Sequence, residues 1–189
     1  VLPELRAAVK GVKIVFFTSN RGELIGSSKS EDDGVELPPA ADFAAASSAA
    51  VHFALRGGNK VDTIHVGDKL YDIVSISAND AEGNPSGALT FAMEIGHDEA
   101  VEISRFTRTE IVLLASNEVI VSTLPRSDGN LRFANMFKEL SAGSPNSGQM
   151  PKAMFDGKHY YCAARQFKTS ASSLGILLLY SYEDSWQSL

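Results

Sequence analysis

Two stretches of this 189-residue sequence repeat one pattern of apolar runs and turns, and this repeat constrains the fold more than any other feature. Residues 13–20 read KIVFFTSN and residues 110–117 read EIVLLASN, so each apolar run ends in the Ser-Asn pair of a turn. A second short apolar stretch that ends in hydroxyl residues follows each run, at 24–28 and at 119–123. A strand, a tight turn and another strand are therefore predicted in both places.

A helix is predicted in the middle of each half. In the first half the Ala-rich segment 42–56 follows two prolines, begins at Asp42, a suitable N-cap, and is followed by a Gly-Gly stop signal. In the second half the segment 131–140 places its Phe, Met and Leu residues at helical spacing, on one stripe. Each predicted helix can therefore cover a sheet with its apolar side.

A further pair of matched segments follows each helix. GDKLYDIVSIS at 67–77 matches DGKHYYCAARQF at 156–167, and ALTFAMEI at 88–95 matches LGILLLYS at 174–181. The order β-β-α-β-β-α thus occurs twice, with about four strands in each half. Because hairpin-linked strands form antiparallel sheets, we predict an α+β fold of two tandem subdomains, each an antiparallel sheet with flanking helices.

The segment 97–108 links the two halves and is predicted to be a helix. It has acidic residues at its start and arginines at its end, as the helix dipole favours. We place the domain boundary within this helix and expect subdomains at 1–104 and 105–189. The first residues, LPELRAAVKG, and the last, EDSWQSL, both look like parts of helices, so we expect an excised segment of a longer chain.

These motifs, above all KIVFFTSNRGELIGSS, GDKLYDIVSI and the terminal GILLLYSYEDSWQSL, resemble double Cache sensors, which carry two five-stranded PAS-like sheets. Similar regions occur in bacterial diguanylate cyclases, phosphodiesterases and related membrane cyclases. The resemblance spans essentially the whole chain, and it implies that 1–104 is the membrane-distal subdomain and 105–189 the membrane-proximal one. It also implies an inner-membrane protein with a periplasmic segment, flanking transmembrane helices and a cytoplasmic output domain.

No catalytic or metal-binding pattern accompanies the repeat. The four histidines lack the spacing of zinc ligands, and Cys162 has no partner cysteine in the sequence. The sequence contains no GxGxxG, P-loop, HExxH or GxSxG motif. Its net charge is −6, and its 17 basic residues are spread along the chain, which disfavours nucleic acid as a partner. We therefore expect a non-enzymatic segment without a metal or a cofactor.

One strand face in the first half is more polar than a sealed core requires. Alternation along 67–77 puts a tyrosine, an isoleucine and two serines on the same side of the strand. The resemblance implies a ligand pocket on the sheet face of the distal half. The candidate ligand-binding residues are therefore Tyr71, Ser75 and Ser77, with His65 and Arg56 as partners for an anionic group. A solvent-facing strand surface is the alternative interpretation of the same alternation.

Two functions remain open at this stage. The main hypothesis is a sensor that binds a small ligand of unknown identity in the distal half and relays a conformational shift through a C-terminal helix beginning at Glu183. The full-length bacterial transmembrane signalling protein would be a cyclic-di-GMP enzyme, a cyclase, a histidine kinase or a chemoreceptor. The alternative is a structural, homodimerising or partner-binding periplasmic module without a small ligand, which predicts a filled distal core and an apolar surface patch.

Overall fold

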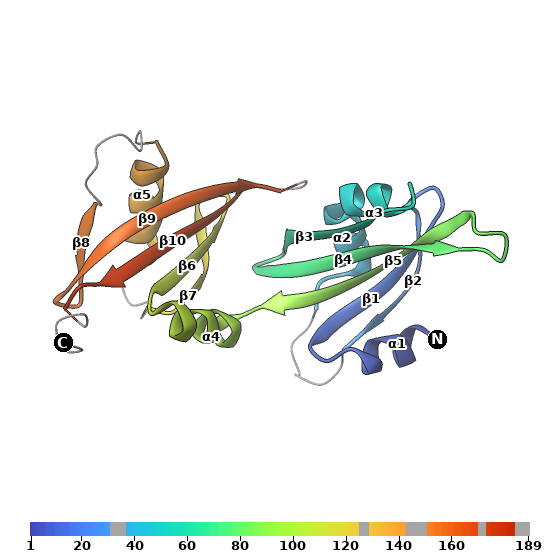
Figure 1. Ribbon diagram of the computed structural model, residues 1–189, viewed down its shortest axis with the longest axis horizontal. Helices are drawn as coiled ribbons and strands as arrows, with labels where there is room; N and C mark the ends of the chain where they lie inside the picture. The colour runs from blue at the N-terminus through green and yellow to red at the C-terminus, as the bar shows by residue number, and fades with distance from the viewer. Residues whose placement is uncertain (31–36, 125–128, 143–150, 170–172, 184–189) are drawn as a thin grey trace. The chain divides into compact units, whose positions relative to one another are not determined.

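The computed structural model describes residues 1–30, 37–124, 129–142, 151–169 and 173–183. They form two compact units, the first built mainly from Val1–Ile95 and the second from the chain that follows it (Figure 1). Each unit has its own antiparallel sheet of five strands. The strand orders are β2-β1-β5-β4-β3 and β7-β6-β10-β9-β8, so the two sheets have the same topology. The predicted duplication and α+β class are confirmed.

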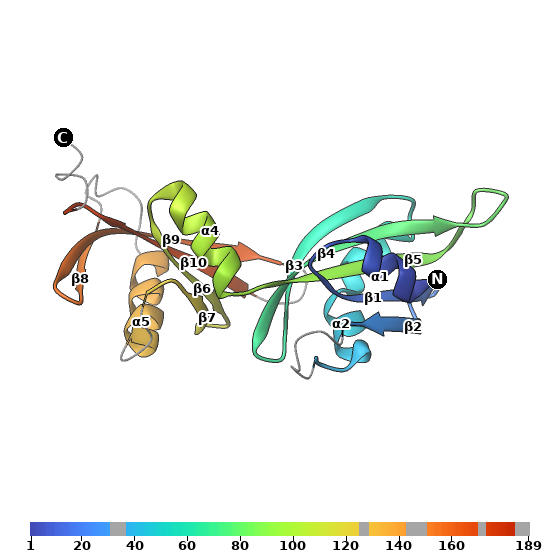
Figure 2. The same ribbon diagram turned by 90° about the horizontal axis from the view of Figure 1, so that it is seen from below.

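In the first unit α2 and α3 cover one face of the sheet, while α1 lies against the other face on β1 and β2 (Figures 1 and 2). The strongly apolar run KIVFFTS forms β1, and its neighbours in the sheet are β2 and β5. The elements are α1 (Leu2–Ala8), β1 (Val12–Ser19), β2 (Leu24–Lys29), α2 (Ala40–Ala46), α3 (Ser48–Ala54), β3 (Asn59–Val66), β4 (Lys69–Asn79) and β5 (Pro85–Ile95).

In the second unit α5 packs against β7, β9 and β10, and α4 contacts β6 and β7. The predicted Ser-Asn turn joins β6 to β7, with φ of 50° at Ser116 and 68° at Asn117, which is the backbone of a tight hairpin. The elements are α4 (His97–Thr107), β6 (Glu110–Ala115), β7 (Glu118–Ser122), α5 (Gly129–Ala142), β8 (Lys152–Phe155), β9 (Lys158–Lys168) and β10 (Ser173–Ser181).

The helix α4 is the predicted connection between the halves. It begins directly after β5, where the backbone N–H of Gly96 donates to Oε2 of Glu99 at 3.0 Å. The contacts of α4 group all of it with the second unit, beginning at Gly96. The boundary at residue 104 stays a prediction, because packing alone does not define a functional subdomain.

Two details of the sequence prediction were wrong. The segment 42–56 forms two short helices, and Pro39, not Asp42, is the N-cap of the first. The break lies at Ser47, where φ is −91° and ψ is 3°, and the Ser47 hydroxyl donates to the carbonyl of Ala44 at 3.3 Å. A serine hydroxyl that bonds to the preceding turn of backbone weakens and bends a helix.

The number of strands was also too low in the prediction from alternation, which gave about four in each half. The two missed strands are β3 and β8, the edge strands that each form a hairpin with the strand after them. β3 mixes charged and apolar residues, and β8 has only four residues, so neither has a clear period of alternation. The five-stranded sheets that the resemblance implies are present in both units.

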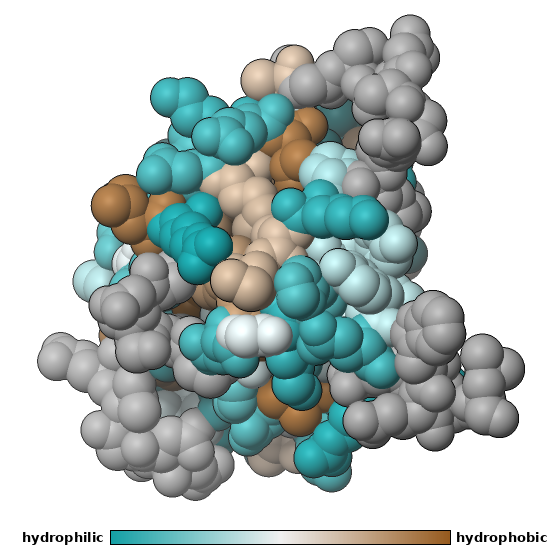
Figure 3. All heavy atoms as spheres, turned by 90° about the vertical axis from the view of Figure 1, so that its left-hand side faces the viewer, coloured by the Kyte–Doolittle hydropathy of each residue, from teal (hydrophilic) through white to brown (hydrophobic). Residues whose placement is uncertain are grey.

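Each unit has a separate hydrophobic core beneath its covering helices. The first consists of Ile14, Phe16, Phe43, Ala50, Val51, Ala54, Ile64, Val66, Tyr71, Ile73, Ala88 and Ala92. The second consists of Val112, Leu114, Leu124, Phe133, Phe137, Phe155, Tyr160, Cys162, Leu177 and Leu179. On the outside of the second unit, hydrophilic side chains surround a narrow band of apolar ones in the view of Figure 3.

Among the described residues, no helix combines the length and the hydrophobicity that crossing a bilayer requires.

Candidate functional site

Tyr71 is the central residue of the candidate site and has no exposed surface. It lies on the face of β4 that α2 covers, where its ring packs edge-on against Phe43 with the centroids 4.8 Å apart. Its hydroxyl group is buried, and no described group forms a hydrogen bond with it. Buried hydroxyls in folded proteins nearly always have a partner, and an unsatisfied one costs about 1–3 kcal/mol. A polar group bound beside Tyr71 would recover that free energy.

Burial, together with nearby negative charges, keeps the Tyr71 hydroxyl protonated. Burial, followed by the negative charges of Glu94 and Asp68, raises the pKa of Tyr71 above its ordinary value. Tyr71 therefore remains a hydrogen-bond donor at any physiological pH. Glu94 lies directly opposite Tyr71 on β5, so both side chains are on the same face of the sheet. Glu94 is paired with Lys69, whose Nζ is 2.8 Å from its Oε1.

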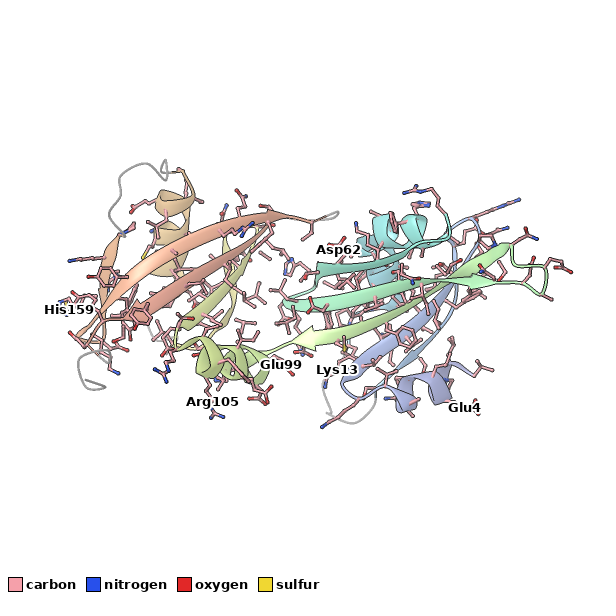
Figure 4. The ribbon with its side chains drawn as sticks, viewed as in Figure 1. Glu4, Lys13, Asp62, Glu99, Arg105 and His159 are labelled. Atoms are coloured by element: carbon pink, nitrogen blue, oxygen red, sulfur yellow. The ribbon has the colours of Figure 1, made fainter. Side chains whose placement is uncertain are left out.

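A second ion pair lies on β3, at the edge of the same sheet. Nζ of Lys60 is 3.1 Å from Oδ2 of Asp62, and the Asp62 side chain is only 12% exposed. Ile64 pairs with Tyr71 across the strands, so Asp62, two residues earlier, projects to the Tyr71 face. Figure 4 shows Asp62 on β3 beside the helices. A ligand on this face would thus meet a neutral donor and two ion pairs.

Hydroxyl groups continue the polar character of this face toward the centre of the sheet. Ser75 and Thr90 are both fully buried and lie opposite each other, with their hydroxyl oxygens 2.9 Å apart. Thr18 is also buried, and its hydroxyl donates to the carbonyl of Ala88 at 3.4 Å. Tyr71 and Ser75 are therefore interior residues, and the interpretation of this face as a solvent-facing surface does not hold for them.

The structure does not bring the other three candidates to Tyr71. Ser77 is half-buried toward the end of β4, where its hydroxyl donates to Oδ1 of Asn79 at 2.8 Å. His65 pairs with Leu70 and so lies on the opposite face, with its Nε2 buried and without a hydrogen-bond partner. Arg56 is exposed after α3, and its guanidinium carbon is 5.8 Å from the centroid of the Phe53 ring.

Sequence reasoning missed several residues of this face. The polar ones on β4 and β5 interrupt mostly apolar strands, which is the signal that could have identified them, whereas β3 gives no such signal. The missed residues are Asp62, Lys69, Thr90 and Glu94, together with the aromatic ring of Phe43. In the part of the chain that the structure describes, no group of three His, Cys, Asp or Glu side chains could hold a metal ion.

Two five-stranded antiparallel sheets of one topology, covered by helices and connected through α4, define the tandem PAS-like or double Cache fold of sensor domains. The chain is similar to the periplasmic domain of LuxQ from Vibrio cholerae, with 11% sequence identity and a TM-score of 0.51 over 92% of this chain and 73% of that one. A second LuxQ structure gives 12% identity and a TM-score of 0.51 over 94% and 75%.

The ligand-binding domain of the Pseudomonas fluorescens chemoreceptor CtaA, solved with L-isoleucine, matches at 12% identity. Its TM-score is 0.47, and the match covers 97% of this chain and 75% of that one. No family model matches the sequence, and no curated protein does so either. At identities this low the similarity is one of fold.

Proposed function

We propose that this chain is the extracytoplasmic sensor module of a bacterial transmembrane signalling protein and that it binds a small polar ligand beneath α2 and α3. The observation that carries the proposal is the Tyr71 hydroxyl, which is buried and without a described partner. It lies beside the Lys69–Glu94 pair, on a face that also holds the buried Ser75–Thr90 hydroxyls. A fold shared with periplasmic sensor domains supports the class.

The chemistry of the face limits the ligand. Because Tyr71 stays protonated, the ligand needs an acceptor oxygen or nitrogen within reach of that hydroxyl. A charged group on the ligand would exchange partners with Lys69–Glu94 or with Lys60–Asp62, both of which are partly buried. Charge-assisted hydrogen bonds of this kind are about twice as strong as neutral ones. We expect a small polar or zwitterionic molecule.

The signalling part of the proposal rests on the tandem arrangement. The distal subdomain 1–104 binds the ligand, and the proximal subdomain 105–189 passes a conformational shift to a C-terminal helix. That helix is predicted to begin at Glu183, and residues 184–189 lie outside the described part of the chain. Transmembrane helices would flank the segment in the inner membrane, and a cytoplasmic output domain would carry the catalytic or kinase-coupled activity. The segment itself would be non-catalytic.

A thermal-shift screen of the purified chain against small metabolites tests the binding proposal. A ligand at 100 times its Kd stabilises the folded state by about 2.7 kcal/mol, which is readily measured as a rise in Tm. Tyr71→Phe should abolish the shift, whereas Tyr160→Phe, the matched change on β9, should leave it intact. A panel without a single stabilising compound would count against the proposal, and so would a compound that binds Tyr71→Phe and the parent chain equally.

One observation favours the alternative of a dimerising or partner-binding module. A cavity of about 380 Å³ on the α1 side of the first sheet is almost entirely apolar, with Leu2, Leu5, Phe17 and Leu89 in its lining. Ile25 at its border is 65% exposed. Sedimentation of the purified chain and of Ile25→Asp distinguishes the two functions. A stable dimer that Ile25→Asp dissociates, in a chain that binds no small molecule, would support the alternative.

A further inference from the structure

A second cavity in the first unit is basic. It has a volume of about 380 Å³, lies between the end of α1 and the start of β1, and is lined by Arg6, Lys10, Gly11, Lys13 and Ser30 among others. Gly11 has a φ of 82°, a backbone conformation that favours glycine, and lies next to Lys10 in the turn between α1 and β1. Figure 4 shows Lys13 at the start of β1, near the end of α1.

This cavity lies on the face of the sheet opposite Tyr71. Ile14 and Phe16 of β1 belong to the core beneath α2 and α3, so the alternating residue Lys13 projects to the α1 side. The cavity therefore shares no described lining residue with the candidate sensor site.

The charge at this cavity is opposite to that of the whole chain. The sequence has 17 basic and 23 acidic residues and a net charge of −6. Three of the 17 basic side chains line this one cavity; Lys13 already has an interaction of its own, so Arg6 and Lys10 are the charges available to a ligand. Like charges gathered in a concave surface raise the local potential and attract a counter-ion. The cluster is thus an electrostatic feature that an anion would stabilise.

Arg6 adds a hydrogen-bond donor to this positively charged cavity. Its Nε is buried, and no described group accepts a hydrogen bond from it. A buried donor without an acceptor costs about 1–3 kcal/mol, and more when the donor is charged. A guanidinium group matches the planar geometry of phosphate and carboxylate oxygens, and Lys10 adds a point charge. The volume is within the range of about 300–1,000 Å³ that small-molecule sites occupy.

We infer that this cavity binds the phosphate or carboxylate group of a small molecule, held by Arg6 and Lys10 with Lys13 at its border. The site goes beyond the proposed sensor function, because it lies on the other face of the sheet and uses none of the Tyr71 side of the fold. Its ligand differs from the one expected at Tyr71 in being anionic as a whole.

Isothermal titration of the purified chain at fixed ionic strength tests the inference, with inorganic phosphate in one arm and malonate in the other. We expect one saturable site, weakened about tenfold by Arg6→Gln and about fivefold by Lys10→Gln, because each change removes a charge-assisted hydrogen bond. Arg105→Gln and Lys158→Gln, exposed basic residues of the second unit, are the matched controls and should bind as the parent chain does. Saturation by phosphate alone identifies a phosphate site, and saturation by both anions identifies a general oxyanion site.

Two results would overturn the inference. The first is the absence of saturable binding of either anion, and the second is equal binding by the parent chain and Arg6→Gln. Tyr71→Phe should not alter phosphate binding, so failure of the sensor proposal would leave this result intact.

Discussion

The strands β5 and β10 occupy the central position of their two sheets. They present different side chains to the helices that cover each sheet. In the first unit β5 presents Ala88, Thr90 and Ala92, whereas at the matching positions of the second unit β10 presents Gly175, Leu177 and Leu179. The match follows from the pairing of each strand with its neighbour, because Ser75 lies opposite Thr90 and Ala164 lies opposite Leu177. At these three positions the same scaffold thus carries small or hydroxyl side chains in one copy and a glycine with two leucines in the other.

The strands β4 and β9 show the same contrast. Both begin with lysine and place a buried tyrosine two residues later, Tyr71 in one and Tyr160 in the other. Four residues further, Ser75 corresponds to Ala164. Cys162, between them on β9, is an ordinary core residue, because burial raises the pKa of its thiol to about 11 and keeps it protonated. At these positions the two copies therefore differ in the polarity of their buried side chains.

The largest expected effect comes from truncating the second core. Leu177→Ala should lower the free energy of unfolding by about 2–5 kcal/mol, since Leu177 is fully buried and leaves a cavity. Thr90→Ala, at the matching position, should cost only about 1 kcal/mol through the lost hydrogen bond to Ser75. Urea denaturation with hydrogen exchange at β5 and β10 measures each unit separately. Equal losses of stability in the two variants would contradict the proposed difference between the two cores.

Tyr71→Phe should raise the stability of the ligand-free chain by about 1 kcal/mol, because it removes a buried hydroxyl that has no described partner. The same substitution weakens ligand binding, so stability and binding should change in opposite directions. Thermal unfolding with and without the ligand measures both. A loss of stability in Tyr71→Phe would mean that the hydroxyl is already satisfied within the protein.

Alkaline pH should destabilise the first unit through the same residue. The pKa of Tyr71 is raised in the folded state, whereas in the unfolded chain it is near the ordinary value of about 10. The stability contributed by Tyr71 is therefore complete below pH 10 and is lost as the pH rises above it, by up to about 1.4 kcal/mol per pH unit. Denaturation between pH 8 and pH 11 should show a steeper loss for the parent chain than for Tyr71→Phe. Parallel curves would exclude a raised pKa at this position.

The smallest expected effect is the coupling between Ser75 and Thr90. A double-mutant cycle of Ser75→Ala and Thr90→Ala should give a coupling energy of about 0.5–1.5 kcal/mol, the range of a buried neutral hydrogen bond. The matching cycle in the second unit, Ala164→Ser with Leu177→Thr, would introduce the same pair into an apolar core. A coupling near zero in the first unit would show that these hydroxyls bond elsewhere.

Much of the fold could be predicted from the sequence because β1 and β6 are strongly apolar runs that end in turn residues. The edge strand β3 could not, because Lys60 and Asp62 put charged side chains on a face that also carries Ile64 and Val66, and their ion pair becomes visible only in the structure. The break at Ser47 was also hidden, since a serine within an Ala-rich segment does not by itself end a helix.

Only the part of the candidate site that lies on a single strand could be predicted from the sequence. Alternation within one strand is local, so Tyr71 and Ser75 were correctly placed on one face of β4. Residues on different strands share a face only if the register between the strands is known. The hairpin pairs Val66 with Lys69, which puts Ile64 beside Tyr71 and His65 behind it. Glu94 reaches Tyr71 because β5 lies next to β4, an adjacency that sequence alone did not assign to the site.

The strand that carries Glu94 continues into α4 after a single residue, Gly96. A ligand that drew Glu94 away from Lys69 would therefore pull on the same stretch of backbone that opens the connecting helix. Only Gly96, whose backbone N–H donates to the Glu99 side chain, lies between the end of β5 and the start of α4. Under the proposed sensor function, Gly96→Ala would restrict the backbone at the one residue between β5 and α4.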